Sequence, residues 1–276
     1  MSRKLTRKDK TLKALFLIII SIGILMISVS AIYIWFWHQD NKKIAKIETS
    51  ISKINPTKEV EDSEQTEVVN PPVSQESDYW YYIKQNLLQA NFQELLQKNS
   101  DTVGWIQVLG TNINYPVVQT TNNEFYLNHD YQKNYNKAGW VYMDYRNNPE
   151  NFNQNTIIYA HSRYDTTMFG SLKQVLTKKW LNNKDNYLIR FSTPNENTLW
   201  QVFSVYTIAK ESYYITPTIS LQEYMTFLTT LKERSIYNFN AELNITDKII
   251  TLSTCKDTNG NRVVLHAKLI KKETRV

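Results

Sequence analysis

The first long hydrophobic run of the chain covers residues 14–37, a stretch of 24 positions without a charged side chain. About 20 apolar residues are enough to cross the hydrocarbon core of a bilayer as a helix. A cleaved signal peptide usually has a shorter apolar region and a small-residue cleavage site, whereas this run continues into the aromatic residues Tyr33, Trp35, Phe36 and Trp37. The pattern predicts an uncleaved transmembrane anchor over residues 14–37.

Positive charge is concentrated just before this hydrophobic run. Residues 1–13 contain six Lys or Arg and one Asp, so they account for +5 of the formal net charge of +6. The flank that is richer in Lys and Arg stays cytoplasmic, which predicts a cytoplasmic tail over 1–13 and an extracellular remainder. The rest of the chain is close to neutral, and this balance argues against a domain that binds nucleic acid.

The next two segments differ in their apolar periodicity. Residues 38–78 are polar and mixed in charge, with prolines at 56, 71 and 72, a composition typical of an extracellular linker. From Tyr79 to Lys98 apolar residues recur at helical spacing, which predicts an amphipathic helix. We therefore expect one folded domain over residues 79–276, large enough to be stable on its own core.

Short apolar runs rich in β-branched and aromatic residues follow this predicted helix. They predict eight strands, at Val103–Val108, Asn114–Val118, Gly139–Met143, Thr156–Tyr159, Tyr187–Phe191, Leu199–Ile208, Lys248–Leu252 and Val263–Ile270. Helical interruptions are expected near Met168–Leu176 and Leu221–Arg234. The predicted fold is mainly β: a closed or nearly closed eight-stranded β-barrel with an N-terminal helix and a few decorating helices, preceded by one transmembrane helix.

Cys255 is the only cysteine of the chain and follows a β-branched apolar run, with turn-forming residues after it. A single cysteine cannot form an internal disulfide, so its thiol is either a small buried hydrophobe or a reactive group. The end of a strand facing a loop is a common position for catalytic groups. A reactive thiolate needs a nearby imidazolium or guanidinium.

The histidines offer one candidate partner for Cys255. His161 follows the run Thr156–Ala160 and so repeats the strand-end position of the cysteine. The other three have different expected roles. His38 lies at the membrane edge, and His129 lies in a polar loop where we expect it to be solvated. His266 lies inside the last predicted strand, where we expect a structural, hydrogen-bonded ring.

Two further residues are candidates because of their spacing from Cys255. Arg262 stands seven positions later at the head of the next predicted strand. If the two strands form a hairpin, Arg262 faces Cys255 across its open end; the alternative is an exposed surface charge. Ser253 lies two positions before Cys255, so strand alternation puts both on one face, where Ser253 either binds substrate or is an ordinary strand serine. One cysteine and no closely spaced histidine pair indicate no metal site, and we expect no cofactor.

The run Thr251–Cys255, followed by Arg262–Leu269, resembles the signature of sortases, the membrane-anchored cysteine transpeptidases of Gram-positive bacteria. Further segments resemble class B sortases in the expected order: Asn112–Gln119, Tyr142–Asn147, Ile157–His161 and Thr167–Gly170. The likeness covers roughly residues 79–272. The family usually has glycine where this chain has Ala160, and because alanine restricts positive φ we expect a slightly different loop there.

The resemblance implies a chemistry and a set of roles. Cys255 would be the nucleophile, His161 the proton-transfer group and Arg262 the oxyanion donor. The substrate would be a secreted protein with a C-terminal sorting pentapeptide, with Pro second and Thr fourth, and the acceptor an amine of a cell-wall precursor, the peptidoglycan cross-bridge. Asn123 and Leu127 match positions that line the substrate groove in class B enzymes, and Ser253 is the third substrate-binding candidate.

Three other functions stay open at this level. A secreted cysteine protease is one, although papain-like enzymes place Cys before His, whereas His161 precedes Cys255 by 94 residues. A non-enzymatic, membrane-tethered binding domain with a buried Cys255 is the second. The third is a pilin-polymerising sortase with a pilin lysine as acceptor. We find no lid segment with an aspartate-aromatic plug in the sequence, and this argues against the third function.

Overall fold

The computed structural model describes residues 7–54, 57–209, 211–254 and 260–275. The chain divides into two compact units, residues 1–46 and residues 47–276. Most of the first unit belongs to helix α1 (Arg7–Ile54), and within the described residues α1 alone is long and apolar enough to cross a membrane. The hydroxyls of Ser21, Ser28 and Ser30 donate to carbonyls four residues earlier, so these polar groups are satisfied inside the helix.

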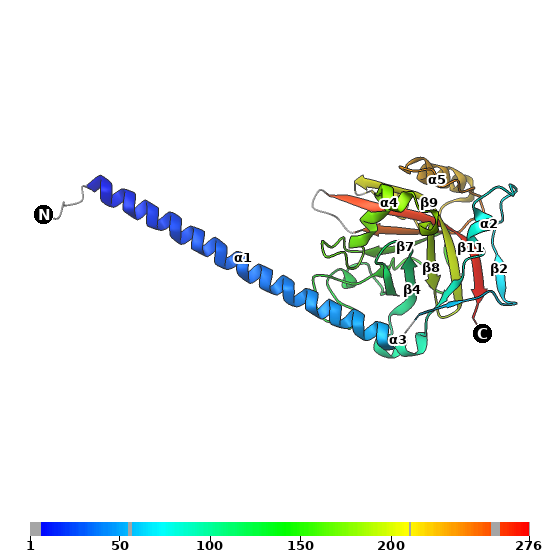
Figure 1. Cartoon of the computed structure of the whole chain (residues 1–276), viewed down its shortest axis with the longest axis horizontal. Helices are drawn as coiled ribbons and strands as arrows, with labels where there is room; N and C mark the ends of the chain where they lie inside the picture. Colours follow the sequence, from blue (N-terminus) through cyan, green and yellow to red (C-terminus); the bar gives the residue numbers. More distant parts are fainter. Residues whose placement is uncertain (1–6, 55–56, 210, 255–259, 276) are drawn as a thin grey trace. The chain divides into compact units, whose positions relative to one another are not determined.

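The second unit is built around a β-barrel. Its strands are β4 (Thr102–Val108), β5 (Asn114–Val118), β6 (Tyr142–Met143), β7 (Asn155–Ala160), β8 (Leu188–Ser192), β9 (Glu196–Ala209), β10 (Ile249–Thr254) and β11 (Asn261–Thr274). They follow the order β10-β7-β6-β5-β4-β8-β9-β11, and β11 pairs back to β10, which closes the barrel (Figure 1). The predicted eight-stranded barrel is confirmed, and each predicted strand overlaps one of these.

Two pairings of β10 organise the region of interest. β10 runs parallel to β7, with Ile249 opposite Asn155 and Thr254 opposite Ala160. It also pairs antiparallel with β11, with Ser253 opposite Val264. The hairpin suggested by the spacing of Cys255 and Arg262 is therefore present in the paired residues of β10 and β11.

The segment expected to be a linker over residues 38–78 contributes to the fold. Helix α1 continues through Ile54, and the strands β1 (Lys58–Val60) and β2 (Thr66–Val68) follow it. β2 pairs with β11 at the edge of the barrel sheet. Two buried cations of the barrel form ion pairs with carboxylates of this segment: Arg190 contacts Glu59 at 2.5 Å, and Lys271 contacts Asp62 at 2.6 Å. Some of the acidic residues in this segment are therefore partners of buried cations.

The prediction of one amphipathic helix over Tyr79–Lys98 is wrong. The structure divides it into α2 (Tyr79–Tyr82), β3 (Leu87–Gln89) and α3 (Phe92–Lys98). β3 pairs with β1, so backbone hydrogen bonds to a distant segment outweigh the local helical periodicity. Asn91 then restarts the helix, because its side chain accepts the Gln93 backbone N–H as an N-cap.

Short helices surround the barrel. They are η1 (Phe125–Leu127), η2 (Gly170–Leu176), α4 (Lys178–Leu181), η3 (Lys184–Asn186), η4 (Tyr213–Ile215) and α5 (Leu221–Glu233). The two predicted interruptions correspond to η2 and α5. Helix α5 lies beside β9 (Figure 1). Its apolar face belongs to a buried cluster with residues of β9, β10 and β11, which includes Phe227, Leu228 and Leu231 together with Phe203 and Ile249.

Candidate active site

The parallel pairing of β7 and β10 sets the position of the candidate site. Ala160 and Thr254 are partners at the ends of these strands, and the next residues in the chain are His161 and Cys255. Cys255 and residues 256–259 lie outside the described residues. The geometry of the site is therefore built from His161, Arg262 and the segments that contact them.

His161 is held by the backbone of η1. Its Nε2 lies 2.6 Å from the carbonyl oxygen of Leu127. A carbonyl can only accept, so Nε2 carries the proton, and Nδ1 is left as the nitrogen that can gain or lose one. The His161 carbonyl accepts the N–H of Phe169 at 3.1 Å, which closes the following loop. The ring thus has a defined tautomer and is half-buried.

Gly139 makes the close approach to the His161 ring possible. Its φ is +61°, in the left-handed region that favours glycine. A Cβ there would lie 3.0 Å from Cδ2 of His161 and 2.5 Å from the carbonyl oxygen of Tyr126. The sequence analysis did not identify a role for this residue at the site, and a lone glycine at the start of a predicted strand was the available signal.

Ala160 does not have the backbone conformation that the resemblance led us to consider. It is an ordinary buried strand residue at the end of β7 and does not belong to the residues with positive φ. Alanine is therefore accommodated without backbone strain, and the expected change in loop setting has no cause at this position.

Arg262 stands near the start of β11, opposite Ile208 of β9. It is half-buried rather than an exposed surface charge. Its Nε is buried and has no hydrogen-bond partner among the described residues. A buried guanidinium donor without a partner is costly, and a ligand oxygen at this position would remove that cost.

The three substrate-binding candidates differ in what they offer. Ser253 is fully buried, and its Oγ lies 3.1 Å from the hydroxyl of Tyr214. Asn123 is partly committed, since its Nδ2 donates to Asp144 at 3.0 Å and its Oδ1 accepts the Tyr145 N–H at 3.0 Å. Leu127 contributes its carbonyl to His161. The structure brings Leu127 and His161 together, while Ser253 contacts the wall formed by η4.

Two of the other histidines have structural contacts. His266 is fully buried between Tyr206 and Thr251, at 2.8 Å from each hydroxyl. Burial, and then the positive charge of Arg234, lower the pKa of His266 to about 3, so it is a neutral structural ring, as predicted. His129 is half-buried rather than solvated, because it stacks on Phe125 with ring centroids 4.0 Å apart.

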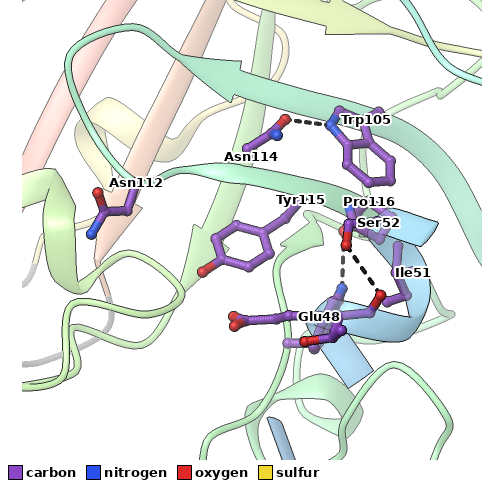
Figure 2. Close-up of a pocket in the computed structure, with 10 residues that line it drawn as sticks. Glu48, Ile51, Ser52, Trp105, Asn112, Asn114, Tyr115 and Pro116 are labelled. Atoms are coloured by element: carbon purple, nitrogen blue, oxygen red, sulfur yellow. Dashed lines mark hydrogen bonds between the residues drawn. The ribbon is translucent and has the colours of Figure 1, made fainter. Parts of the chain in front are cut away.

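A pocket of about 280 Å³ lies elsewhere, between residues 48–52 and strands β4 and β5 (Figure 2). Some of its polar groups are paired: the indole N–H of Trp105 donates to Asn114 at 2.7 Å, and the hydroxyl of Ser52 donates to the Thr49 carbonyl at 3.1 Å. One carboxylate oxygen of Glu48, Oε1, is buried without a hydrogen-bond partner among the described residues. A pocket is the usual first hypothesis for an active site. This one has neither a thiol nor a histidine among its lining residues, and it contains none of the site residues predicted from the sequence.

No metal centre is evident in the part of the chain that the structure describes. No group of three His, Cys, Asp or Glu side chains there could hold an ion. The side chains described near these strand ends include the imidazole of His161 and the guanidinium of Arg262.

A family model and known proteins match this chain. A family model described as the sortase domain matches residues 106–270. Sortase B of Staphylococcus aureus is 37% identical over 191 residues, which are 68% of this chain and 78% of that protein. Sortase B of Listeria monocytogenes is 35% identical over 184 residues, which are 65% of this chain and 74% of that protein.

Solved structures agree with this similarity. A crystal structure of sortase B complexed with triglycine aligns with a TM-score of 0.61 at 37% identity, over 65% of this chain and 85% of that chain. A Bacillus anthracis protein described as similar to sortase B aligns with a TM-score of 0.65 at 34% identity, over 87% of this chain and 98% of that chain. The family model covers more than half of the chain, and both curated relatives exceed 30% identity. The chain therefore belongs to the sortase family of cysteine transpeptidases, and its relatives are sortases of class B.

Proposed function

We propose that this sortase cleaves a sorting signal through a thioacyl intermediate on Cys255. The observation that carries the proposal is the parallel register of β7 and β10, which ends with Ala160 opposite Thr254. His161 and Cys255 each follow one of these paired residues in the sequence, which supports their action as proton-transfer group and nucleophile of one site. Covalent catalysis of this kind divides one difficult exchange into two easier steps.

The two cationic residues have different roles in the proposed reaction. The Cys255 thiolate attacks the carbonyl carbon of the Thr residue, and the oxyanion that forms accepts a hydrogen bond from Arg262. This role is supported by the buried Nε of Arg262, which has no partner among the described residues. When the peptide C–N bond breaks, Nδ1 of His161 gives its proton to the departing amine, because Nε2 is already committed to Leu127.

The second step transfers the acyl group to an amine. The acceptor nitrogen attacks the thioester, Nδ1 of His161 takes its proton, and Sγ leaves as thiolate. A related sortase B has been solved with triglycine, which supports an amine-terminated peptide of the cell-wall cross-bridge as acceptor. The donor is a secreted protein whose sorting pentapeptide has Pro second and Thr fourth, with Asn123, Leu127 and Ser253 as candidate contacts.

We expect the reaction to take place at the membrane surface, with the enzyme anchored by helix α1. Helix α1 contains an apolar stretch long enough to span a bilayer, and the basic residues 1–13 precede it. The excess of Lys and Arg supports a cytoplasmic N-terminus and an extracellular catalytic domain. An anchored enzyme meets secreted substrates and lipid-linked acceptors in one plane, which raises their effective concentration.

The test uses the full chain in detergent micelles with a library of pentapeptides that have Pro second and Thr fourth, with and without triglycine. Product masses report the cleavage site and the ligated peptide together. We expect ligation to exceed hydrolysis when triglycine is present. Turnover retained by Cys255→Ala would contradict the proposed nucleophile, and hydrolysis unaffected by triglycine would indicate a protease.

A further inference from the structure

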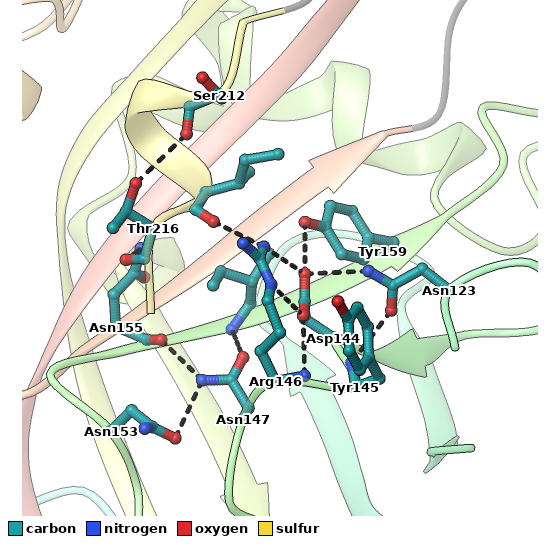
Figure 3. A network of polar contacts seen from close by, with 12 residues as sticks. Asn123, Asp144, Tyr145, Arg146, Asn147, Asn153, Asn155, Tyr159, Ser212 and Thr216 are labelled. Carbon is teal, nitrogen blue, oxygen red and sulfur yellow. Dashed lines mark hydrogen bonds and ion pairs between the residues drawn. The ribbon is translucent and has the colours of Figure 1, made fainter. Parts of the chain in front are cut away.

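The carboxylate of Asp144, which directly follows β6, accepts an unusual number of hydrogen bonds. Its side chain is fully buried and is paired with Arg146, whose Nε and Nη2 lie 2.8 Å and 2.7 Å from the two oxygens. The backbone N–H of Arg146 adds a third bond at 3.0 Å. Burial alone would raise the pKa of Asp144, but the bonds from Arg146 outweigh it and lower the pKa. Asp144 is therefore held as an anion, and Figure 3 shows the hydrogen bonds that converge on it.

The same carboxylate connects to the segment that holds His161. Oδ2 of Asp144 accepts the Asn123 Nδ2 at 3.0 Å. Asn123 precedes η1, and the last residue of η1, Leu127, contacts Nε2 of His161. A short and hydrogen-bonded stretch of chain thus separates the Asp144 contact from the contact that orients the imidazole.

A second connection enters β7 directly. The hydroxyl of Tyr159 donates to Oδ2 of Asp144 at 3.0 Å. Tyr159 lies two residues before His161 and is opposite Ser253 in the register of β7 and β10. Burial and the negative charge of Asp144 raise the pKa of Tyr159, so its hydroxyl keeps its proton and remains a donor.

The third connection joins Arg146 to η4, the short helix that contacts Ser253. Nη2 of Arg146 also donates to the carbonyl of Ile215, at 2.8 Å. Ile215 ends η4, whose Tyr214 contacts the hydroxyl of Ser253. Figure 3 shows Arg146 between Asp144 and this segment. One buried carboxylate and its arginine therefore link three segments that contact His161 or Ser253.

We propose that Asp144 is a positioning residue for the transpeptidase site, and that Arg146 positions η4, whose Tyr214 contacts the substrate-binding candidate Ser253. The proposal rests on the proposed function for the roles of His161 and Ser253. Asp144 touches no reacting atom; it acts through Asn123 and Tyr159 on the histidine side and through Arg146 on the peptide side.

The test compares Asp144→Asn, Arg146→Ala and Arg146→Lys in the full chain in detergent micelles. An asparagine cannot accept all the donors that converge on Asp144, and misplacing a catalytic group by about 1 Å costs about 100-fold in rate. We expect Asp144→Asn to lower kcat/KM by about that factor. Arg146→Ala should raise KM for the pentapeptide about tenfold. It should also lower kcat, by less than Asp144→Asn does, because it removes the ion-pair partner of Asp144. Arg146→Lys should recover part of that loss.

The matched control is Asp247→Asn. Asp247 is equally buried and is ion-paired with Lys268 at 3.1 Å, but it precedes β10 at the end opposite to Thr254. We expect this variant to lose stability without a change in KM or kcat per folded molecule. If Asp144→Asn behaves like Asp247→Asn in both kinetic constants, the proposal is overturned.

Amide hydrogen exchange gives a readout that needs no activity. Exchange should accelerate at residues 123–127 in Asp144→Asn and at 213–216 in Arg146→Ala, and at neither segment in Asp247→Asn. Unchanged protection of both segments overturns the positioning roles. If the wild-type protein shows no turnover with any pentapeptide, the proposed function fails, and the exchange rates still decide the positioning proposal.

Discussion

Asp144 and Asp247 are two buried carboxylates of one barrel, each paired with a cation. Their side chains are both fully buried, but the partners differ: Arg146 is 40% exposed, whereas Lys268 is 4% exposed. Asp144 joins segments that contact His161 and Ser253. Asp247 instead joins the start of β10 to Asn70, whose Nδ2 lies 2.8 Å from its Oδ1.

The difference shows that burial of charge does not by itself identify a functional residue. Desolvating an ion is costly wherever it occurs, and a buried ion pair is weak evidence for stabilisation. The segments that the carboxylate joins decide its role. At Asp247 the joined segments are the start of β10 and the segment around Asn70, so we expect a structural role. At Asp144 they are the segments that contact His161 and Ser253 in the candidate site.

The largest expected effect is on the site side of this comparison. Arg262→Ala should lower kcat by about 10²–10³-fold, the usual loss for one oxyanion donor. The unfolding free energy should change little, because the Nε of Arg262 has no partner to lose among the described residues. Steady-state kinetics with chemical unfolding measure both, and Arg262→Lys, which keeps the charge but loses Nε, is the control. A kcat within twofold of wild type would remove Arg262 from the mechanism.

The next effect tests the structural side. Asp247→Ala leaves Lys268 buried without its carboxylate, and breaking such a pair costs about 3 kcal/mol or more. The loss should appear in the midpoint of urea unfolding, while kcat/KM per folded molecule stays unchanged. Adding Lys268→Met should recover part of the stability, since replacing both partners removes the stranded charge. Loss of kcat/KM in the folded fraction would erase the contrast with Asp144.

The barrel was predictable because each strand carries its own pattern. Runs such as Ile249–Leu252 are apolar and β-branched, and this local signal needs no knowledge of the partner strand. The segment around Leu87 was not predictable in the same way. Its two leucines fit a helical face and a strand equally well, and its pairing with β1 depends on residues almost thirty positions away.

The candidate site was predictable at the level of single residues but not of their contacts. The lone Cys255 and the strand-end His161 are visible in the sequence. The Leu127 carbonyl that fixes the His161 tautomer is a backbone group, and no residue type indicates it. Asp144 lay within the resemblance, but its role depends on donors from three separate segments, and only the fold brings those donors together.

A smaller effect concerns the middle of β10, where Thr251 pairs with His266. Burial lowers the pKa of His266 to about 3, below the usual value near 6.5. Between these values the unfolded chain binds a proton that the folded chain does not, so stability is complete above pH 6.5 and falls as the pH drops. The slope approaches about 1.4 kcal/mol per pH unit. Unfolding curves at pH 7, 6 and 5 measure it, and His266→Gln should flatten it. An equal slope in that variant would assign the acid sensitivity to other groups.

The smallest effect is expected at the edge of the sheet, where Lys272 and Glu67 join β11 to β2. Their side chains are 36% and 65% exposed, and Nζ of Lys272 lies 3.0 Å from Oε2 of Glu67. Exposed pairs contribute about 0–1 kcal/mol and are screened by salt. Glu67→Gln should therefore lower the unfolding free energy by at most about 1 kcal/mol, a difference that shrinks in high salt. A loss as large as that of Asp247→Ala would mean that the N-terminal segment is held to the barrel by this pair, and that burial is a poor guide to which charges matter here.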